Sequence, residues 1–258
     1  MKVPIARTKL TEKEFNIIKK PLESGWLVQG PYTKKFEEKW NSFTGAKHSI
    51  AVTSCTTALH LSLFALGLKP KDEVILPAFT WIATANVVEH LNAKVVFCDI
   101  DLKTFNIDVT KIEDKITSRT KAIMPVHLFG LSVDMDPLLQ IAKKYNLIVI
   151  EDNAEALGGK YKGQMLGTLG DVSCFSFFAN KILTTGEGGM ILSNDSELAT
   201  RIRTLRDHGM SAEKKYHYKE IGYNYRMTNM QASIGVAQLE KLNDTLNIRN
   251  DQMDLYYK

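Results

Sequence analysis

The stretch HSIAVTSCTTALHLSLFALG, residues 48–67, joins a strand pattern to a helix pattern and decides the fold. HSIAVTS (48–54) has the apolar character of a buried strand, and TTALHLSLFALG reads as the helix that follows it. The strand pattern recurs in EVILP (73–77), KVVFCDI (94–100), KAIMPVHL (121–128) and LIVIED (147–152). Helical patterns such as TWIATANVVEHL and DPLLQIAKKYN lie between these runs. This alternation predicts an α/β fold, in which a mostly parallel sheet carries helices on both faces.

Size, charge and cysteine usage narrow the class of protein. The 258 residues are 44% hydrophobic and 24% charged, which is typical of a soluble globular protein with one large α/β domain or two small ones. A net charge of +4 with scattered basic pairs argues against a nucleic-acid-binding surface. The longest apolar stretch, ALHLSLFALGL (58–68), is too short to span a bilayer, so we expect a cytoplasmic protein. Cys55, Cys98 and Cys174 have no metal-ligand spacing and predict reduced structural thiols.

One lysine and one aspartate indicate the chemistry. Lys181 follows an apolar, aromatic run in CFSFFANKILTTGEGGM (174–190), where a free ammonium would be expensive to bury. Asp152 ends the strand pattern NLIVIED. Pyridoxal phosphate (PLP) uses a lysine for a covalent link and a carboxylate to keep its ring nitrogen protonated. Together the two residues therefore suggest PLP, and neither a P-loop nor a dinucleotide-binding glycine pattern is present.

Further polar residues fall at the predicted carboxyl ends of strands, where ligands bind in such sheets. Ser54, Thr56 and Thr57 stand at a strand-to-helix junction, either to hold a phosphate on free amides or simply to cap the helix. Trp81 and His127 fall at the same edge. For His127 we favour a satisfied core histidine over a catalytic one.

Four segments resemble a known family: TSCTTALHLSLFALGLKPKDEVILPAFTWIATAN, EDNAEALGGKYKGQMLGTLGDV, SFFANKILTTGEGGM and GYNYRMTNMQASIG. They are similar to the DegT/DnrJ/EryC1/StrS family of PLP-dependent aminotransferases that act on nucleotide-linked keto-sugars. Within it, the motifs look most similar to GDP-perosamine synthase-like enzymes. The resemblance runs from Val3 to about Leu242 and implies an aspartate aminotransferase-like, fold type I large domain.

The resemblance also implies roles for individual residues. Lys181 would link to the cofactor and move a proton between carbon atoms, while Asp152 would pair with the ring nitrogen. Trp81 would stack on the ring, although a core tryptophan is the competing interpretation. Glu155 would lie near the phenolic oxygen, with a solvated loop acid about equally plausible. The phosphate would be held at the turn of Ser54, by the amides of Cys55 and Thr56, by the Ser176 hydroxyl and by Asn224 of a neighbouring subunit.

The resemblance divides the chain into two parts. Residues 1–228 would form the PLP-binding large domain with an N-terminal arm (1–30), and residues 229–258 would begin a helix that leads to an absent C-terminal small domain. A capping box of Thr228 and Gln231 starts this helix, and no Gly or Pro after Gly235 stops it before Lys258. Cys55 replaces a glycine usual in the family, which would weaken cofactor binding or expose a thiol.

The function implied is transfer of an amino group from L-glutamate to a keto carbon of a nucleotide-linked 4-keto-6-deoxyhexose. It would serve polysaccharide or O-antigen sugar synthesis, in a homodimer with shared active sites. A sugar dehydratase of the same family typically has histidine at the lysine position, and Lys181 argues against it. The alternative from another class is a non-catalytic PLP-binding or regulatory module, or a truncated inactive paralogue.

Overall fold

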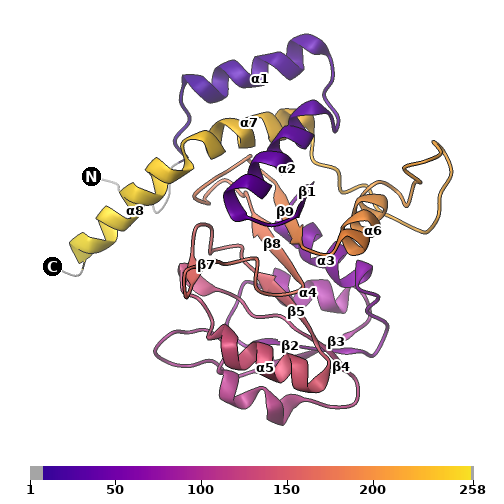
Figure 1. The fold of residues 1–258 in the computed structure, drawn as a ribbon, viewed down its shortest axis with the longest axis vertical. Helices are drawn as coiled ribbons and strands as arrows, with labels where there is room; N and C mark the ends of the chain where they lie inside the picture. Colours follow the sequence, from indigo (N-terminus) through magenta and orange to yellow (C-terminus); the bar gives the residue numbers. More distant parts are fainter. Residues whose placement is uncertain (1–7, 257–258) are drawn as a thin grey trace.

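A seven-stranded sheet forms the centre of the structure, a computed structural model that describes residues 8–256 (Figure 1). The strands are β1 (His48–Val52), β2 (Glu73–Pro77), β3 (Lys94–Cys98), β4 (Thr120–Ile123), β5 (Ile148–Asp152), β8 (Val172–Ser176) and β9 (Gly189–Ser193). Their order is β1-β9-β8-β5-β4-β2-β3. β9 runs antiparallel to β1 and β8, and the other pairs are parallel. The mostly parallel sheet is therefore confirmed.

Helices cover both faces of this sheet. In chain order the helices are α1 (Glu12–Ser24), α2 (Pro31–Thr44), α3 (Cys55–Ala65), α4 (Ala83–Glu89), α5 (Met135–Tyr145), α6 (Ser196–Arg206), α7 (Asn229–Glu240) and α8 (Leu242–Tyr256), of which α1 packs on α7 rather than on the sheet. Short 3₁₀ turns lie at Val109–Lys111, Glu113–Lys115 and Leu128–Gly130, and a small hairpin pairs β6 (Lys160–Tyr161) with β7 (Gln164–Met165). Among the described residues, no helix is both long and apolar enough to cross a membrane.

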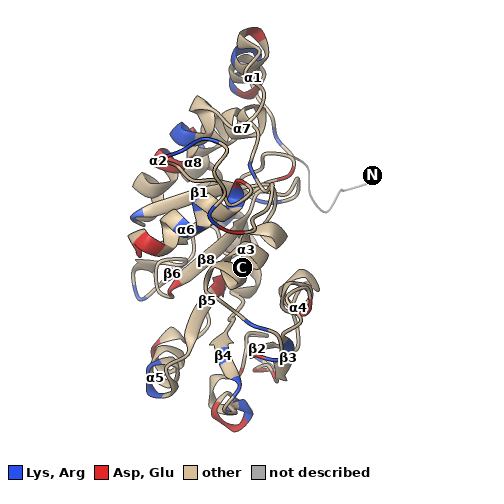
Figure 2. Cartoon of the chain, turned by 90° about the vertical axis from the view of Figure 1, so that its right-hand side faces the viewer, with Lys and Arg blue, Asp and Glu red and all other residues tan. Residues whose placement is uncertain are grey.

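Alternate residues of each strand enter different cores, which makes three layers. On β1, Ile50 and Val52 pack into the core that includes buried residues of α3, α4 and α6, whereas Ala51 packs with buried residues of α2 and α7. On β2, Val74 joins the first core and Ile75 joins a third core beneath α5. Figure 2 shows the sheet nearly edge-on, with α3 and α4 on one side and α2 and α5 on the other. The period of two places successive residues of β5 on opposite faces as well.

The C-terminal helix is broken, which corrects the prediction of one uninterrupted helix. The Thr228 cap is confirmed, because its side chain accepts from Gln231 N. The helix then ends at Glu240 and a second one begins at Leu242. Between them, Lys241 has φ −114° and ψ 12°. Its Nζ lies 2.6 Å from Oε1 of Glu14, a buried side chain on α1. The break is thus tied to α1, which lies beside α7 in Figure 1.

Candidate active site

Asp152 ends β5 as a buried carboxylate aimed at the α4 side of the sheet. Its side chain is 4% exposed, and its Oδ2 accepts from the Thr84 hydroxyl of α4 at 2.9 Å. Its Oδ1 accepts from the N–H of Ala154 at 3.1 Å. Burial raises the pKa of Asp152, while these hydrogen bonds and the charge of Lys181 act in the opposite direction. The site therefore holds a buried carboxylate that has only two hydrogen-bond donors and lies near the positive charge of Lys181.

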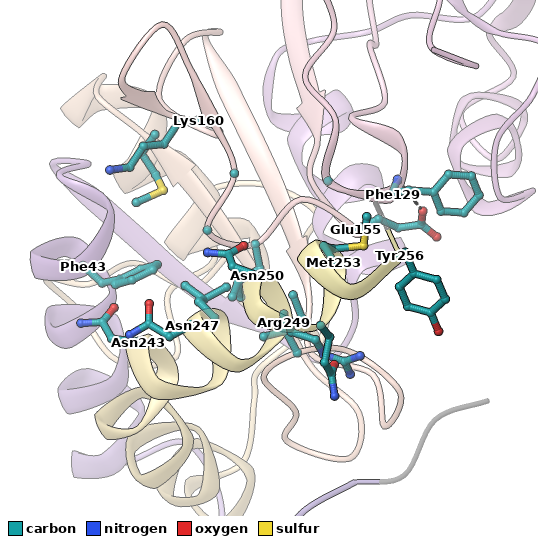
Figure 3. Close-up of a pocket in the computed structure, with 18 of the residues that line it drawn as sticks. Phe43, Phe129, Glu155, Lys160, Asn243, Asn247, Arg249, Asn250, Met253 and Tyr256 are labelled. Carbon is teal, nitrogen blue, oxygen red and sulfur yellow. Dashed lines mark hydrogen bonds between the residues drawn. The ribbon is translucent and has the colours of Figure 1, made fainter. Parts of the chain in front are cut away.

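Lys181 and Glu155 approach each other at the same edge. Lys181 follows β8 in a loop, and its Nζ lies 3.7 Å from Oε1 of Glu155. The other oxygen of Glu155 accepts from the N–H of Phe129 at 3.1 Å, and Figure 3 shows these two residues together. Phe129 has φ +54°, a conformation uncommon for a bulky residue. Glu155 is thus half-buried and held from two sides rather than free in solvent.

The turn after β1 is a capped helix start with free amides. The Ser54 hydroxyl accepts from Thr57 N, and the Thr57 hydroxyl accepts from Ser54 N, so the capping interpretation is confirmed. The first N–H groups of a helix have no intrahelical acceptor, and those of Cys55 and Thr56 begin α3. A Cβ at Gly189 would lie 2.4 Å from the Ser54 carbonyl oxygen, so glycine lets β9 approach this turn closely. The turn is compatible with an anion on its backbone.

The Cys55 thiol is not exposed, which answers one of the expectations for this position. Its side chain is buried, and burial raises the pKa of the thiol well above its ordinary value, with the nearby Asp152 charge adding to the shift. Cys98 and Cys174 are buried and free as well. Among residues 8–256, no group of three His, Cys, Asp or Glu side chains is arranged to hold a metal ion.

Trp81 and Ser176 are two further residues that the sequence predicted at the cofactor site. Trp81 is 76% exposed and precedes α4, so the core-tryptophan interpretation is wrong. Ser176 is the last residue of β8, and its hydroxyl accepts from Phe178 N at 3.4 Å. Asn224 is exposed on an extended segment that also borders β1, since Thr53 N donates to the Tyr225 carbonyl at 3.1 Å. The roles assigned to these residues toward a cofactor stay predictions.

His127 is a satisfied core histidine, as the sequence favours. Its Nδ1 accepts from Val133 N at 3.1 Å, and its Nε2 lies 3.1 Å from Oε2 of Glu151, with both side chains fully buried. Because Nδ1 accepts a hydrogen bond, the ring proton is on Nε2, which donates a hydrogen bond to Glu151. Glu151 also accepts from the N–H groups of Gly167, Leu169 and Gly170. Glu151, Thr84 and Phe129 were not predicted from the sequence, although the period of two along β5 places Glu151 and Asp152 on opposite faces of the sheet.

A large cavity opens beside Glu155. It measures about 1300 Å³ and lies between α8 and the segment from Glu155 to the β6–β7 hairpin (Figure 3). Phe129 and Glu155 line it near the last turn of α8, where Tyr256 stands. Asn243, Asn247 and Asn250 line it along α8. Lys181 therefore stands next to a space large enough for a ligand larger than a single amino acid.

Comparisons with known proteins identify the family of this chain. Residues 8–258 match the DegT/DnrJ/EryC1/StrS aminotransferase family. This chain belongs to that family. It is 47% identical over 256 residues to the GDP-perosamine synthase of Caulobacter vibrioides, covering 99% of this chain and 69% of the relative. It is 45% identical to the GDP-perosamine synthase of Escherichia coli O157:H7, covering 99% of this chain and 71% of the relative.

The solved structures agree with the family assignment. A Streptococcus pneumoniae protein named as a sugar aminotransferase, in its PLP form, superposes with a TM-score of 0.94 at 34% identity. The match covers 99% of this chain and 71% of that chain. The predictions of the family, of the fold class and of PLP as the cofactor are thereby confirmed. This chain spans about two thirds of the length of these relatives.

The residues of this chain fit PLP. The group needs an acid for its ring nitrogen, a lysine for its aldehyde and amides for its phosphate. The buried Asp152, the neighbouring Lys181 and the first turn of α3 supply one of each. The close approach of Gly189 to Ser54 keeps the phosphate turn compact. Nothing in the described site conflicts with the cofactor.

Proposed function

We propose that this protein transfers the amino group of L-glutamate to the keto carbon of a nucleotide-linked 4-keto-6-deoxyhexose, in a cytoplasmic step of cell-surface polysaccharide synthesis. The main observation behind this proposal is that the buried Asp152 and the Lys181–Glu155 ion pair lie at the same edge of the sheet. The similarity to two GDP-perosamine synthases supports a GDP-linked sugar. The cavity beside Glu155 supports an acceptor of large size.

The chemistry divides between the cofactor and the side chains. When bound, PLP supplies an electron sink that lets a proton leave the carbon next to the amino nitrogen. Asp152 would hold the proton on the ring nitrogen, because its burial leaves an adjacent cation as its best partner. Lys181 would carry the proton between carbon atoms on its Nζ, serving the glutamate half and the sugar half in turn. Glu155 would keep the Lys181 ammonium in place, since the two are 3.7 Å apart.

We also propose that two copies share their active sites, with Asn224 of one copy reaching the cofactor phosphate of the other. Large aromatic side chains are exposed around the catalytic edge, which supports a surface that a second copy covers. Trp81 and Phe129 are 76% and 74% exposed, and Phe79 packs on Phe105 with both partly exposed. A symmetric dimer would bury the same patch on both copies.

The proposal is tested by supplying both substrates. The PLP-loaded protein is mixed with L-glutamate and a GDP-linked 4-keto-6-deoxyhexose, and 2-oxoglutarate and the aminated sugar nucleotide are measured by mass spectrometry. We expect stoichiometric formation of both products, and slower reaction with the dTDP-linked sugar. Formation of 2-oxoglutarate without any aminated sugar would contradict the acceptor, and absence of both products would contradict the whole proposal.

A further inference from the structure

The segment from Tyr223 to Arg226 is held as an extended strand between α6 and the end of β1. Tyr223 N donates to the Leu205 carbonyl at 2.7 Å, and Tyr225 N donates to the Arg206 carbonyl at 3.0 Å. On its other edge, the Tyr225 carbonyl accepts from Thr53 N at 3.1 Å. Side chains alternate along such a segment. The two tyrosines are half-buried on one side, and Asn224 is exposed on the other.

The two tyrosines stack on each other and pack edge to face against one histidine of α3. Their rings lie 4.9 Å apart at an interplanar angle of 11°. His60 meets Tyr223 edge to face at 5.0 Å and Tyr225 at 5.9 Å. The Tyr225 hydroxyl and His60 Nδ1 are 3.3 Å apart, and His60 is itself buried. Residues two apart in a strand are normally separated by about 6.6 Å, so the stack draws the two side chains together.

This aromatic cluster fixes what the backbone hydrogen bonds leave free. Those bonds hold the segment in place, but its rotation about the chain axis depends on where the side chains pack. The cluster of Tyr223, Tyr225 and His60 holds one side against α3, so Asn224 lies on the opposite side. The same helix begins at the Ser54 turn, so the cluster ties the direction of Asn224 to the element that offers its first amides to the cofactor phosphate.

We propose that His60, Tyr223 and Tyr225 are positioning residues that aim Asn224 at the cofactor phosphate of the neighbouring subunit. The inference rests on the proposed function, because it takes the shared active site from there. Their assigned role is positional, because each acts through Asn224. The Tyr225 hydroxyl with His60 Nδ1 is the contact that a single substitution can remove without a large loss of packing.

The test measures how fast the PLP-loaded protein releases cofactor into a trap. Loss of one neutral hydrogen bond changes an equilibrium constant or a rate constant by about fivefold. We expect Tyr225→Phe and His60→Leu to speed release by about fivefold or more. His60→Asn should restore most of the retention, because the Asn oxygen can accept from Tyr225. Tyr161→Phe is the matched control, since its hydroxyl bonds Asp134 away from this cluster and its loss should leave release unchanged.

Mixed dimers show in which subunit the cluster acts. Tyr225→Phe protein is mixed with an excess of Lys181→Ala protein. In the mixed dimers, only the Tyr225→Phe subunit can hold the cofactor on Lys181. The Asn224 that reaches this cofactor comes from the Lys181→Ala subunit, whose aromatic cluster is intact. We expect release from these mixed dimers to return to the wild-type rate. Unchanged fast release would overturn the inference, as would wild-type release in both Tyr225→Phe and His60→Leu homodimers. If Asn224→Ala itself has no effect on release, the proposed shared site fails instead.

Discussion

Asp152 and Glu151 are neighbours on β5, and both carboxylates are buried, yet their surroundings differ completely. Glu151 is fully buried and accepts from His127 and from three backbone N–H groups. Burial by itself raises the pKa of Glu151, but the hydrogen bonds from His127 and the backbone outweigh burial and lower it. Asp152 has one hydroxyl and one N–H donor, and burial raises its pKa.

The difference separates a structural acid from a functional one. Every donor around Glu151 comes from the fold itself, so its charge is satisfied before any ligand arrives. Asp152 has fewer donors and lies near the positive charge of Lys181, so a cationic ligand group would complete its interactions. A buried acid with too few partners lowers the stability of the ligand-free protein, and a cationic ligand group that pairs with it compensates for this cost.

Lys181→Ala should abolish covalent attachment of the cofactor and lower amino transfer by about 10²–10⁴-fold or more, the range for a proton-transferring group. Covalent attachment is measured by mass spectrometry after borohydride reduction of the PLP-loaded protein. Lys162→Ala is the control, because Lys162 lies in the turn between β6 and β7 with its side chain mostly exposed and paired with Asp136. Equal labelling of Lys181→Ala and wild type would contradict the assignment of the lysine.

Asp152→Asn should slow the glutamate half-reaction by roughly 10²-fold, in the range for removing one preorganised electrostatic contact. The unfolding free energy of the apo-protein should be unchanged or higher, because the variant no longer buries a poorly paired charge. Stopped-flow absorbance and urea unfolding give the two quantities. A variant that is both active and less stable would make Asp152 a structural residue.

Glu151→Gln should do the reverse. An amide cannot accept on both of its ends, so donors among His127, Gly167, Leu169 and Gly170 lose their acceptor. Leaving such a group unpaired costs about 1–3 kcal/mol. We expect a loss of unfolding free energy of this size in urea, with the half-reaction slowed much less than in Asp152→Asn. A larger kinetic effect than that of Asp152→Asn would remove the distinction between the two acids.

The two acids should also give pH dependences of opposite sign. The folded pKa of Glu151 lies below its ordinary value of 4.5, so its stabilising contribution is present above that pH and is lost as the pH falls. The folded pKa of Asp152 lies above 3.8, so its contribution is largest at low pH and is lost as the pH rises. Between pH 3 and 6, the unfolding free energy of the apo-protein should therefore fall less steeply with acid in Glu151→Gln than in the wild type. In Asp152→Asn it should fall more steeply than in the wild type. Parallel curves for both variants would contradict these pKa directions.

Much of the fold could be predicted from the sequence because its signals are local. The apolar runs that became β1, β2, β3 and β5 are bounded by Gly, Pro or polar residues, and each lies within one or two residues of its predicted position. The antiparallel direction of β9 has no such local signal. The break at Lys241 coincides with its contact to Glu14, more than two hundred residues away, and neither Gly nor Pro marks it in the sequence.

The candidate site was predictable only where its chemistry is unusual. Lys181 and Asp152 stood out because a lysine or an aspartate rarely belongs in an apolar run. Glu151 was not predicted, because its role depends on hydrogen bonds from His127 and from N–H groups 16 to 19 residues further along the chain. Phe129 gave no signal, since its contribution to Glu155 is a backbone N–H in a left-handed conformation.

The most direct measurement is the visible absorption of the PLP-loaded protein before and after L-glutamate, recorded beside Lys181→Ala. The account predicts a band from lysine-held cofactor that shifts when glutamate is added and is absent from the variant. A band that forms but ignores glutamate would contradict the proposed amino transfer while leaving the binding site intact. A folded protein with no band would contradict the central claim that the Asp152 and Lys181 edge holds PLP.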